Sequence, residues 1–231
     1  MLTVIAWLSL SVAAACFLLI ALDERKHPQK MPVMNIVWPV TALYFSVFAL
    51  WAYYRIGRRM ERDRHAAEMV SDDARKSPVE RKPRWSAVAV SASHCGAGCV
   101  LADILCESAV YLLALTLWGQ SLYASYLLDL AGAWLFGIAF QYFAIKPMKH
   151  LSAGAALKAA IKADTLSIVA FQAGMYAWMA VVYFVLWPQP HLAPNQPGFW
   201  LMMQIAMVFG FFTTLPMNYW LIKIGVKESM G

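Results

Sequence analysis

The stretch ASHCGAGCVLADILCE, residues 92–107, decides how this chain folds. It begins a long apolar run and carries a histidine, three cysteines and two carboxylates. On a helix, Cys95, Cys99 and Asp103 are each four residues apart, and Cys106 and Glu107 continue the same face. Because ionisable side chains are costly inside a membrane, such a row predicts a functional site within a membrane helix.

The composition predicts an integral membrane protein. Of 231 residues, 61% are hydrophobic and only 14% are charged, and no polar stretch is long enough to form a soluble domain. The net charge of +6 does not indicate nucleic-acid binding, because the basic residues cluster beside the apolar runs. The four cysteines lie in or beside apolar runs and do not resemble a secreted disulfide framework. The expected partner is the lipid bilayer.

Apolar runs of about 20 residues predict an all-α, polytopic membrane helix bundle with six transmembrane helices. The predicted spans are residues 2–22, 33–54, 88–118, 122–145, 165–187 and 199–222. The first run has no basic start, so we expect it to be retained and not cleaved. The predicted organisation is an N-terminal two-helix hairpin (1–54), a basic cytoplasmic linker (55–84) and a four-helix membrane domain (85–231).

The distribution of Lys and Arg predicts the orientation of these spans. Residues 55–84 carry ten of them, whereas residues 188–198 carry none. If the basic segments are cytoplasmic, sixteen Lys and Arg lie inside and three outside, and both termini are cytoplasmic. The three exceptions are Arg25, Lys26 and Lys30, in the first predicted loop. The expected location is the bacterial inner membrane.

The polar row predicts a site for a soft metal ion. Thiolate, imidazole and thioether groups are the ligands that monovalent copper prefers. Cys95 and Cys99 can share one ion on a helix, and the adjacent His94 can supply a third ligand. Packing is the alternative for the cysteines alone. It does not explain Asp103, because a charged Asp at the centre of a span costs about 2.5–3.5 kcal/mol on insertion scales. Asp103 and Glu107 are expected to balance the charge of the ion or to exchange protons.

Two methionine pairs add thioethers at helical spacing. Met175 and Met179 are four residues apart in the fifth predicted span, and Met203 and Met207 are four apart in the sixth. Each pair places two thioethers on one helix face, a layout suited to passing a soft cation along. Ordinary core packing is the alternative, since methionine is common inside membranes.

Other polar positions have ordinary explanations. Asp164 opens the fifth predicted span, where a carboxylate can cap the helix N-terminus and complement its dipole. Residues 151–163 are expected to form a short amphipathic stretch at the membrane surface. Gln172 and Gln204 are suited to bonding neighbouring helices.

Four sequence blocks resemble a known family. They are HCGAGCVLADI (94–104), LKAAIKADTLSI (157–168), FWLMMQIAM (199–207) and LPMNYWLIKIGVKE (215–228). They are similar to an uncharacterised bacterial membrane family, catalogued as domain of unknown function 4396, over roughly residues 85–229. The resemblance leaves the first two predicted spans outside and implies no established activity.

Together these patterns predict a membrane protein that binds a soft metal ion, with copper as the first choice, and takes part in its transport or tolerance. We do not expect an enzyme. With no ATP-binding loop in the sequence, a gradient or a partner would drive transport. Two alternatives stay open: a membrane thiol-disulfide protein that exchanges a Cys95–Cys99 disulfide with a quinone or a partner, and a non-catalytic scaffold subunit. A homo-oligomer or a partner membrane protein is compatible with each of them.

Overall fold

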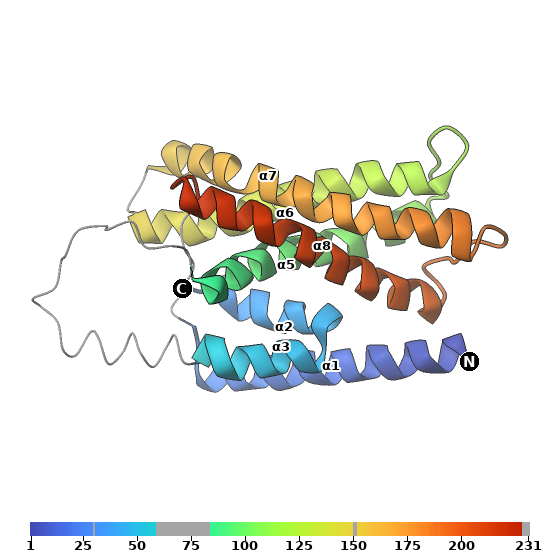
Figure 1. Cartoon of the computed structure of the whole chain (residues 1–231), viewed down its shortest axis with the longest axis horizontal. Coiled ribbons are helices and arrows are strands. Elements are labelled where there is room, and N and C mark those ends of the chain that lie inside the picture. The colour runs from blue at the N-terminus through green and yellow to red at the C-terminus, as the bar shows by residue number, and fades with distance from the viewer. Residues whose placement is uncertain (30, 59–83, 150–151, 228–231) are drawn as a thin grey trace, which may run out of the picture.

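The fold is a bundle of long helices whose axes follow one direction (Figure 1). The computed structural model describes residues 1–29, 31–58, 84–149 and 152–227. The described elements are α1 (Leu2–Lys26), α2 (Met34–Phe45), α3 (Val47–Ala52), the π-helical turn η1 (Tyr53–Gly57), α5 (Trp85–Leu112), α6 (Ser121–Lys149), α7 (Ala153–Val181), the π-helical turn η2 (Val182–Leu186) and α8 (Pro197–Lys223). Apart from one isolated β-bridge, these residues contain no β-structure, so the prediction of an all-helical fold is confirmed.

Five of the described helices are long and apolar enough to cross a membrane. They are α1, α5, α6, α7 with its η2 extension, and α8. The predicted second span, 33–54, is not a single helix. Its longest helix, α2, has 12 residues, which reach about 18 Å at 1.5 Å per residue. A hydrocarbon core of roughly 30 Å is too thick for α2 to cross.

Residues 34–57 instead form a hairpin that starts and finishes at the same end of the bundle (Figure 1). The chain reverses at Ser46, which has a φ of 48°. The ring centroids of Trp38, near the start of α2, and Tyr53, after α3, lie 5.8 Å apart. The Tyr53 hydroxyl donates to Asp23 near the end of α1 at 2.8 Å. The second arm of the hairpin therefore contacts the end of α1, and the two arms contact each other there.

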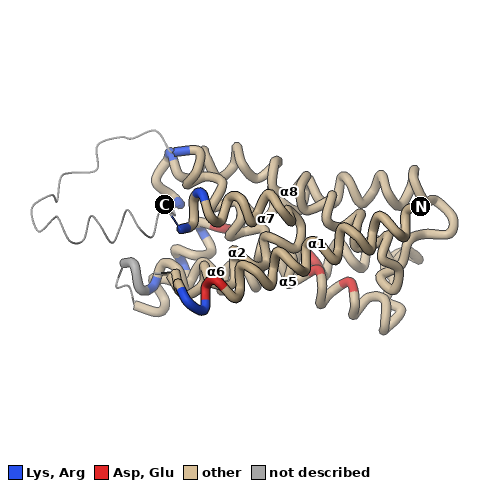
Figure 2. The backbone as a smooth tube through the Cα atoms, turned by 90° about the horizontal axis from the view of Figure 1, so that it is seen from below, with Lys and Arg blue, Asp and Glu red and all other residues tan. Residues whose placement is uncertain are grey.

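The basic residues lie at one end of the bundle (Figure 2). Every described Lys and Arg is found there. They include Arg25 and Lys26 in the last turn of α1, two of the three exceptions under the six-span prediction. Residues 59–83, most of the predicted basic linker, lie outside the described residues. The chain begins at the end opposite to the one where α8 finishes (Figure 1). The expected six spans, with both termini on one side of the membrane, therefore stay a prediction.

The central helix of the bundle is α5. Of its most apolar stretch, 78% is buried, against 22–44% for the other four membrane-length helices. Small residues let it approach α6 closely, since a Cβ added at Gly98 would lie 3.1 Å from the backbone nitrogen of Gly137. The N-terminal helices pack onto the rest. Ser9 Oγ donates to Gln204 Oε1 at 2.7 Å, and Gln204 Nε2 donates to the backbone carbonyl of Leu43 at 2.6 Å. The polar face of α5 is thus enclosed by protein.

Candidate functional site

The predicted polar row faces the interior of the bundle. Its buried members are His94, Cys95, Cys99, Asp103 and Glu107. Ile104 and Leu105, on the other side of α5, are exposed. The predicted row is therefore buried except for Cys106, which is half-buried. Cys95 belongs to one polar cluster, and Asp103 and Glu107 belong to another.

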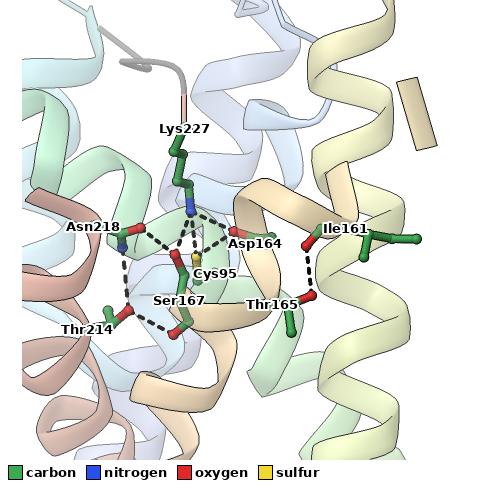
Figure 3. Close-up of polar contacts among 8 residues, drawn as sticks. All are labelled: Cys95, Ile161, Asp164, Thr165, Ser167, Thr214, Asn218 and Lys227. Carbon is green, nitrogen blue, oxygen red and sulfur yellow. Dashed lines mark hydrogen bonds and ion pairs between the residues drawn. The ribbon is translucent and has the colours of Figure 1, made fainter. Parts of the chain in front are cut away.

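The first cluster, which we call the ionic cluster, consists of Cys95, Asp164, Ser167 and Lys227 at the basic end (Figure 3). Lys227 Nζ lies 2.6 Å from Asp164 Oδ1, and both side chains are fully buried. The same ammonium donates to Cys95 Sγ at 3.1 Å and to Ser167 Oγ at 3.2 Å. Cys95 Sγ in turn donates to Asp164 Oδ1 at 3.1 Å. Each of the three N–H groups of the ammonium thus has an acceptor.

Lys227 reaches this position because the chain turns back after α8. Gly225 has a φ of 72° and donates its N–H to the Ile222 carbonyl at 3.1 Å. Val226 donates to the Leu221 carbonyl at 3.0 Å. These two bonds and the left-handed glycine form a Schellman motif, which ends the helix and reverses the chain. The next residue, Lys227, is directed into the bundle.

The electrostatic surroundings keep Lys227 charged. Burial lowers the pKa of its ammonium, but the Asp164 carboxylate and Cys95 raise it by more, and the pKa lies above the usual value of 10.5. At neutral pH the group is therefore a buried cation beside a carboxylate.

A ring of hydrogen bonds between α7 and α8 holds the cluster (Figure 3). Ser167 Oγ donates to Asn218 Oδ1 at 2.7 Å, and Asn218 Nδ2 donates to Thr214 Oγ1 at 3.4 Å. Thr214 Oγ1 donates to the Ser167 carbonyl at 2.9 Å. Ser167, which contacts Lys227, is therefore fixed from both helices.

The prediction that Asp164 caps a helix is wrong. Asp164 lies in the interior of α7, which begins at Ala153. Residues 151–163, expected to lie along the membrane surface, are largely the first part of this continuous helix, and Ala156 and Ala160 are buried. The stretch is rich in alanine, the strongest helix former, so nothing interrupts the helix before Asp164.

The second cluster, which we call the carboxylate cluster, consists of Asp103 and Glu107 from α5 and Asp129 from α6. Ser125 donates to Glu107 Oε2 at 2.9 Å, and Asp129 lies within hydrogen-bonding reach of Glu107. Asp103 interacts electrostatically with both other carboxylates. In the described part of the chain, both oxygens of Asp103 and Oδ1 of Asp129 have no hydrogen-bond partner. None of the three forms an ion pair with a described residue.

Two cavities reach the carboxylate cluster. Asp103 lines a cavity of about 250 Å³ together with Met203 and Met207. Glu107 lines another, of about 330 Å³, together with Met179. Asp103 and Glu107 therefore each border a separate cavity.

These features lie in the part of the chain that a family model covers. The model named Domain of unknown function (DUF4396) matches residues 84–227. The chain belongs to the DUF4396 family. The matched segment holds both clusters and ends at Lys227, whereas α1, α2 and α3 precede it. No curated protein and no solved structure matches the chain.

Within the DUF4396 segment, the predicted metal ligands do not meet at one point. Among the described residues, no group of three or more His, Cys, Asp and Glu could hold a metal ion. The His94 ring lies 5.9 Å from that of Phe140, and Cys95 contacts Lys227. Cys99 interacts electrostatically with Asp103.

The methionine pairs are also divided within the DUF4396 segment. Met203 and Met207 line one cavity and Met179 the other, while Met175 is buried in the core. All four cysteines are free thiols. Copper binding and thiol-disulfide exchange stay predictions.

Sequence reasoning missed the partners that other helices bring. Lys227 counts in the sequence only as an orientation signal, and Asp129 is one more acid in an apolar run. A usable signal for Lys227 is the glycine two residues before it, directly after the last apolar run, because such a glycine commonly ends a helix and reverses the chain. For Asp129, the general rule that intramembrane acids are functional would have sufficed.

Proposed function

We propose that this protein is a multi-pass transporter of the bacterial inner membrane that exchanges protons at its carboxylate cluster while it moves a cation. The electrostatic interaction among Asp103, Glu107 and Asp129 carries this proposal. Three adjacent negative charges repel strongly where the effective dielectric constant is low, so they do not all ionise without compensation. The cluster therefore shares protons, or exchanges them for a cation.

The two cavities support a route through the cluster. Glu107 adjoins the cavity that His191 and Pro194 also line, in the loop before α8, at the end away from the basic residues. Asp103 adjoins the other cavity. A proton or cation that reaches one carboxylate can pass to the next without crossing an apolar layer.

For the orientation, we propose five crossings and a re-entrant hairpin, with the basic end in the cytoplasm and the start of α1 outside. Every described Lys and Arg then lies on the inner side, as the positive-inside rule favours. A protease-cleavable tag fused before Met1 is expected to be cut from outside intact spheroplasts, and the same tag after Gly231 only after lysis. Protection of both tags would contradict this orientation and favour the six-span arrangement.

A soft metal ion is the second candidate for the cargo. Asp103, Met203 and Met207 line one cavity, which combines a carboxylate with two thioethers, and thioethers favour monovalent copper. In this version copper is the substrate, and His94, Cys95 and Cys99 receive it at the cytoplasmic end.

Proton exchange is testable in proteoliposomes that contain a trapped pH-sensitive dye. We expect Glu107→Gln and Asp129→Asn each to lower the proton flux driven by a potassium diffusion potential by about 10-fold or more, because an amide has no titratable proton. Asp23→Asn is the matched control, since this carboxylate lies 3.6 Å from Arg58 at the basic end, outside the cluster. A Glu107→Gln protein with the same proton flux as the parent would contradict the proposal.

The cargo is tested in the same vesicles by adding monovalent copper under reducing conditions. Met203→Leu/Met207→Leu keeps the side-chain volume but removes both thioethers, so any stimulation of the flux by copper is expected to disappear. Met202→Leu is the control, because this neighbouring methionine lines neither cavity. Copper stimulation that survives the double substitution counts against a soft-metal cargo.

A further inference from the structure

The ammonium of Lys227 fills a polar site that other elements build. Cys95 comes from α5, and Asp164 and Ser167 come from α7. Lys227 itself belongs to the short segment after α8 and is 2% exposed. Figure 3 shows its side chain reaching between the helices to these three residues. A cation carried by a separate segment thus occupies acceptors fixed in the bundle.

More buried polar atoms surround this cation than Lys227 binds. Asp164 Oδ2, both ring nitrogens of His94 and both amide atoms of Gln141 are buried without a hydrogen-bond partner in the described part of the chain. His94 interacts electrostatically with Asp164 and Lys227. Gln141 is one helical turn from Gly137, whose added Cβ would lie 3.2 Å from Asp164 Oδ2. Buried polar groups in native proteins normally have partners, so these atoms point to a mobile polar occupant such as water or a hydrated ion.

We propose that Cys95, Asp164 and Ser167 form a cation-binding site at the cytoplasmic end of the pathway. In this site Lys227 is a tethered cation, which a transported cation displaces from Asp164. The inference rests on the proposed transport function, since the displacing cation is the one that the transporter moves.

The displacement breaks no covalent bond. The entering cation takes the place of the ammonium beside Asp164, and the ammonium of Lys227 keeps its three protons and moves into water. Asp164 is therefore not left buried without a counter-charge.

The accessibility of Cys95 reports whether the site is closed. The full chain is prepared with Cys16→Ala, Cys99→Ala and Cys106→Ala and reconstituted in liposomes without any gradient, and its alkylation by N-ethylmaleimide is timed by mass spectrometry. With Lys227 and Asp164 in place, slow alkylation is expected, because Cys95 is fully buried. Asp164→Asn, which removes the charge that holds Lys227, is expected to raise the rate by about 10-fold or more although Lys227 is intact.

Lys227→Met is expected to raise the rate of alkylation of Cys95 as well. Removal of the ammonium destabilises the thiolate and by itself slows alkylation, so an increase reports access and not reactivity. Lys223→Met, a change at an exposed lysine in the last turn of α8, should leave the rate unchanged.

Two results would overturn the inference. One is an unchanged rate in Asp164→Asn. The other is an equal rise at Cys99 in a protein that keeps Cys99 as its single cysteine, because this thiol is also buried and general loosening would expose both. Since no gradient is applied, the outcome does not depend on the flux measurement. If the flux test fails and Asp164→Asn still raises the rate of Cys95 alkylation, the transport function is wrong and the displaceable lysine is supported.

Discussion

Lys227→Met is expected to lower the free energy of unfolding by about 3–5 kcal/mol, because it leaves the Asp164 carboxylate buried without its counter-charge. The two groups lie 2.6 Å apart and both are fully buried, so water does not screen the lost charge. Unfolding in mixed micelles with an increasing fraction of SDS, followed by circular dichroism at neutral pH, measures this change. The raised pKa of Lys227 means that its contribution is fully present below the usual lysine value of 10.5 and is lost only as the pH rises through the raised value.

The double variant Lys227→Met/Asp164→Asn separates charge from packing. Replacing both members of a buried pair by neutral groups of similar size is often nearly neutral, so most of the lost stability is expected to return. Lys223→Met should stay within about 0.5 kcal/mol of the parent, as an exposed position does. A double variant that loses the sum of the two single losses would show that the pair is not coupled.

Gly210→Val is expected to destabilise the bundle by about 3 kcal/mol, at the upper end of the range for overpacking. A Cβ at Gly210 would lie 2.7 Å from the carbonyl oxygen of Phe171, a backbone atom that cannot rotate away. At Gly174, on the facing helix, an added Cβ would meet the Thr213 side chain. The contact between α7 and α8 therefore depends on residues without a side chain.

Gly154→Val supplies the matched control for Gly210→Val. Gly154 is also in a helix, in the first turn of α7, but a Cβ there would meet nothing within 4 Å. Its substitution is expected to change stability by less than about 1 kcal/mol, by the same unfolding measurement. Equal losses at the two positions would mean that β-branching, and not helix spacing, causes the effect.

Much of the fold follows from local pattern. The predicted last span, 199–222, agrees with α8, Pro197–Lys223, to within two residues at each end. The buried face of α5 was predictable because its polar groups recur every four residues in an apolar run. Such a pattern fixes a helix and the direction of its side chains before any tertiary contact is known.

The hairpin at 34–57 was not predictable in the same way. One membrane span and two consecutive short apolar helices have the same hydropathy and the same total length. The reversal occurs at Ser46, a residue that does not normally mark a positive φ, where Gly or Asn is expected. Only packing against α1, α5 and α8 shows which of the two arrangements forms.

The candidate site, too, could be predicted only in part from the sequence. Spacing along α5 predicted which residues share a face, but it carries no information on what other helices place opposite them. The pairing of Cys95 with Asp164 and Lys227 spans 69 and 132 residues of sequence. Likewise, the spacing of Met203 and Met207 gives a common face and not the cavity that this face lines.

The hairpin of α2 and α3 has a consequence for chains that carry only the family domain. Leu43 and Tyr44, at the tip of the hairpin, and Leu10 and Ala13 of α1 form part of the wall around Asp103. All four precede residue 84, where the family match begins. A protein trimmed to that segment would leave an acidic group bordering hydrocarbon, so we infer that any homologue without α1–α3 needs a substitute helix or a second subunit on this side.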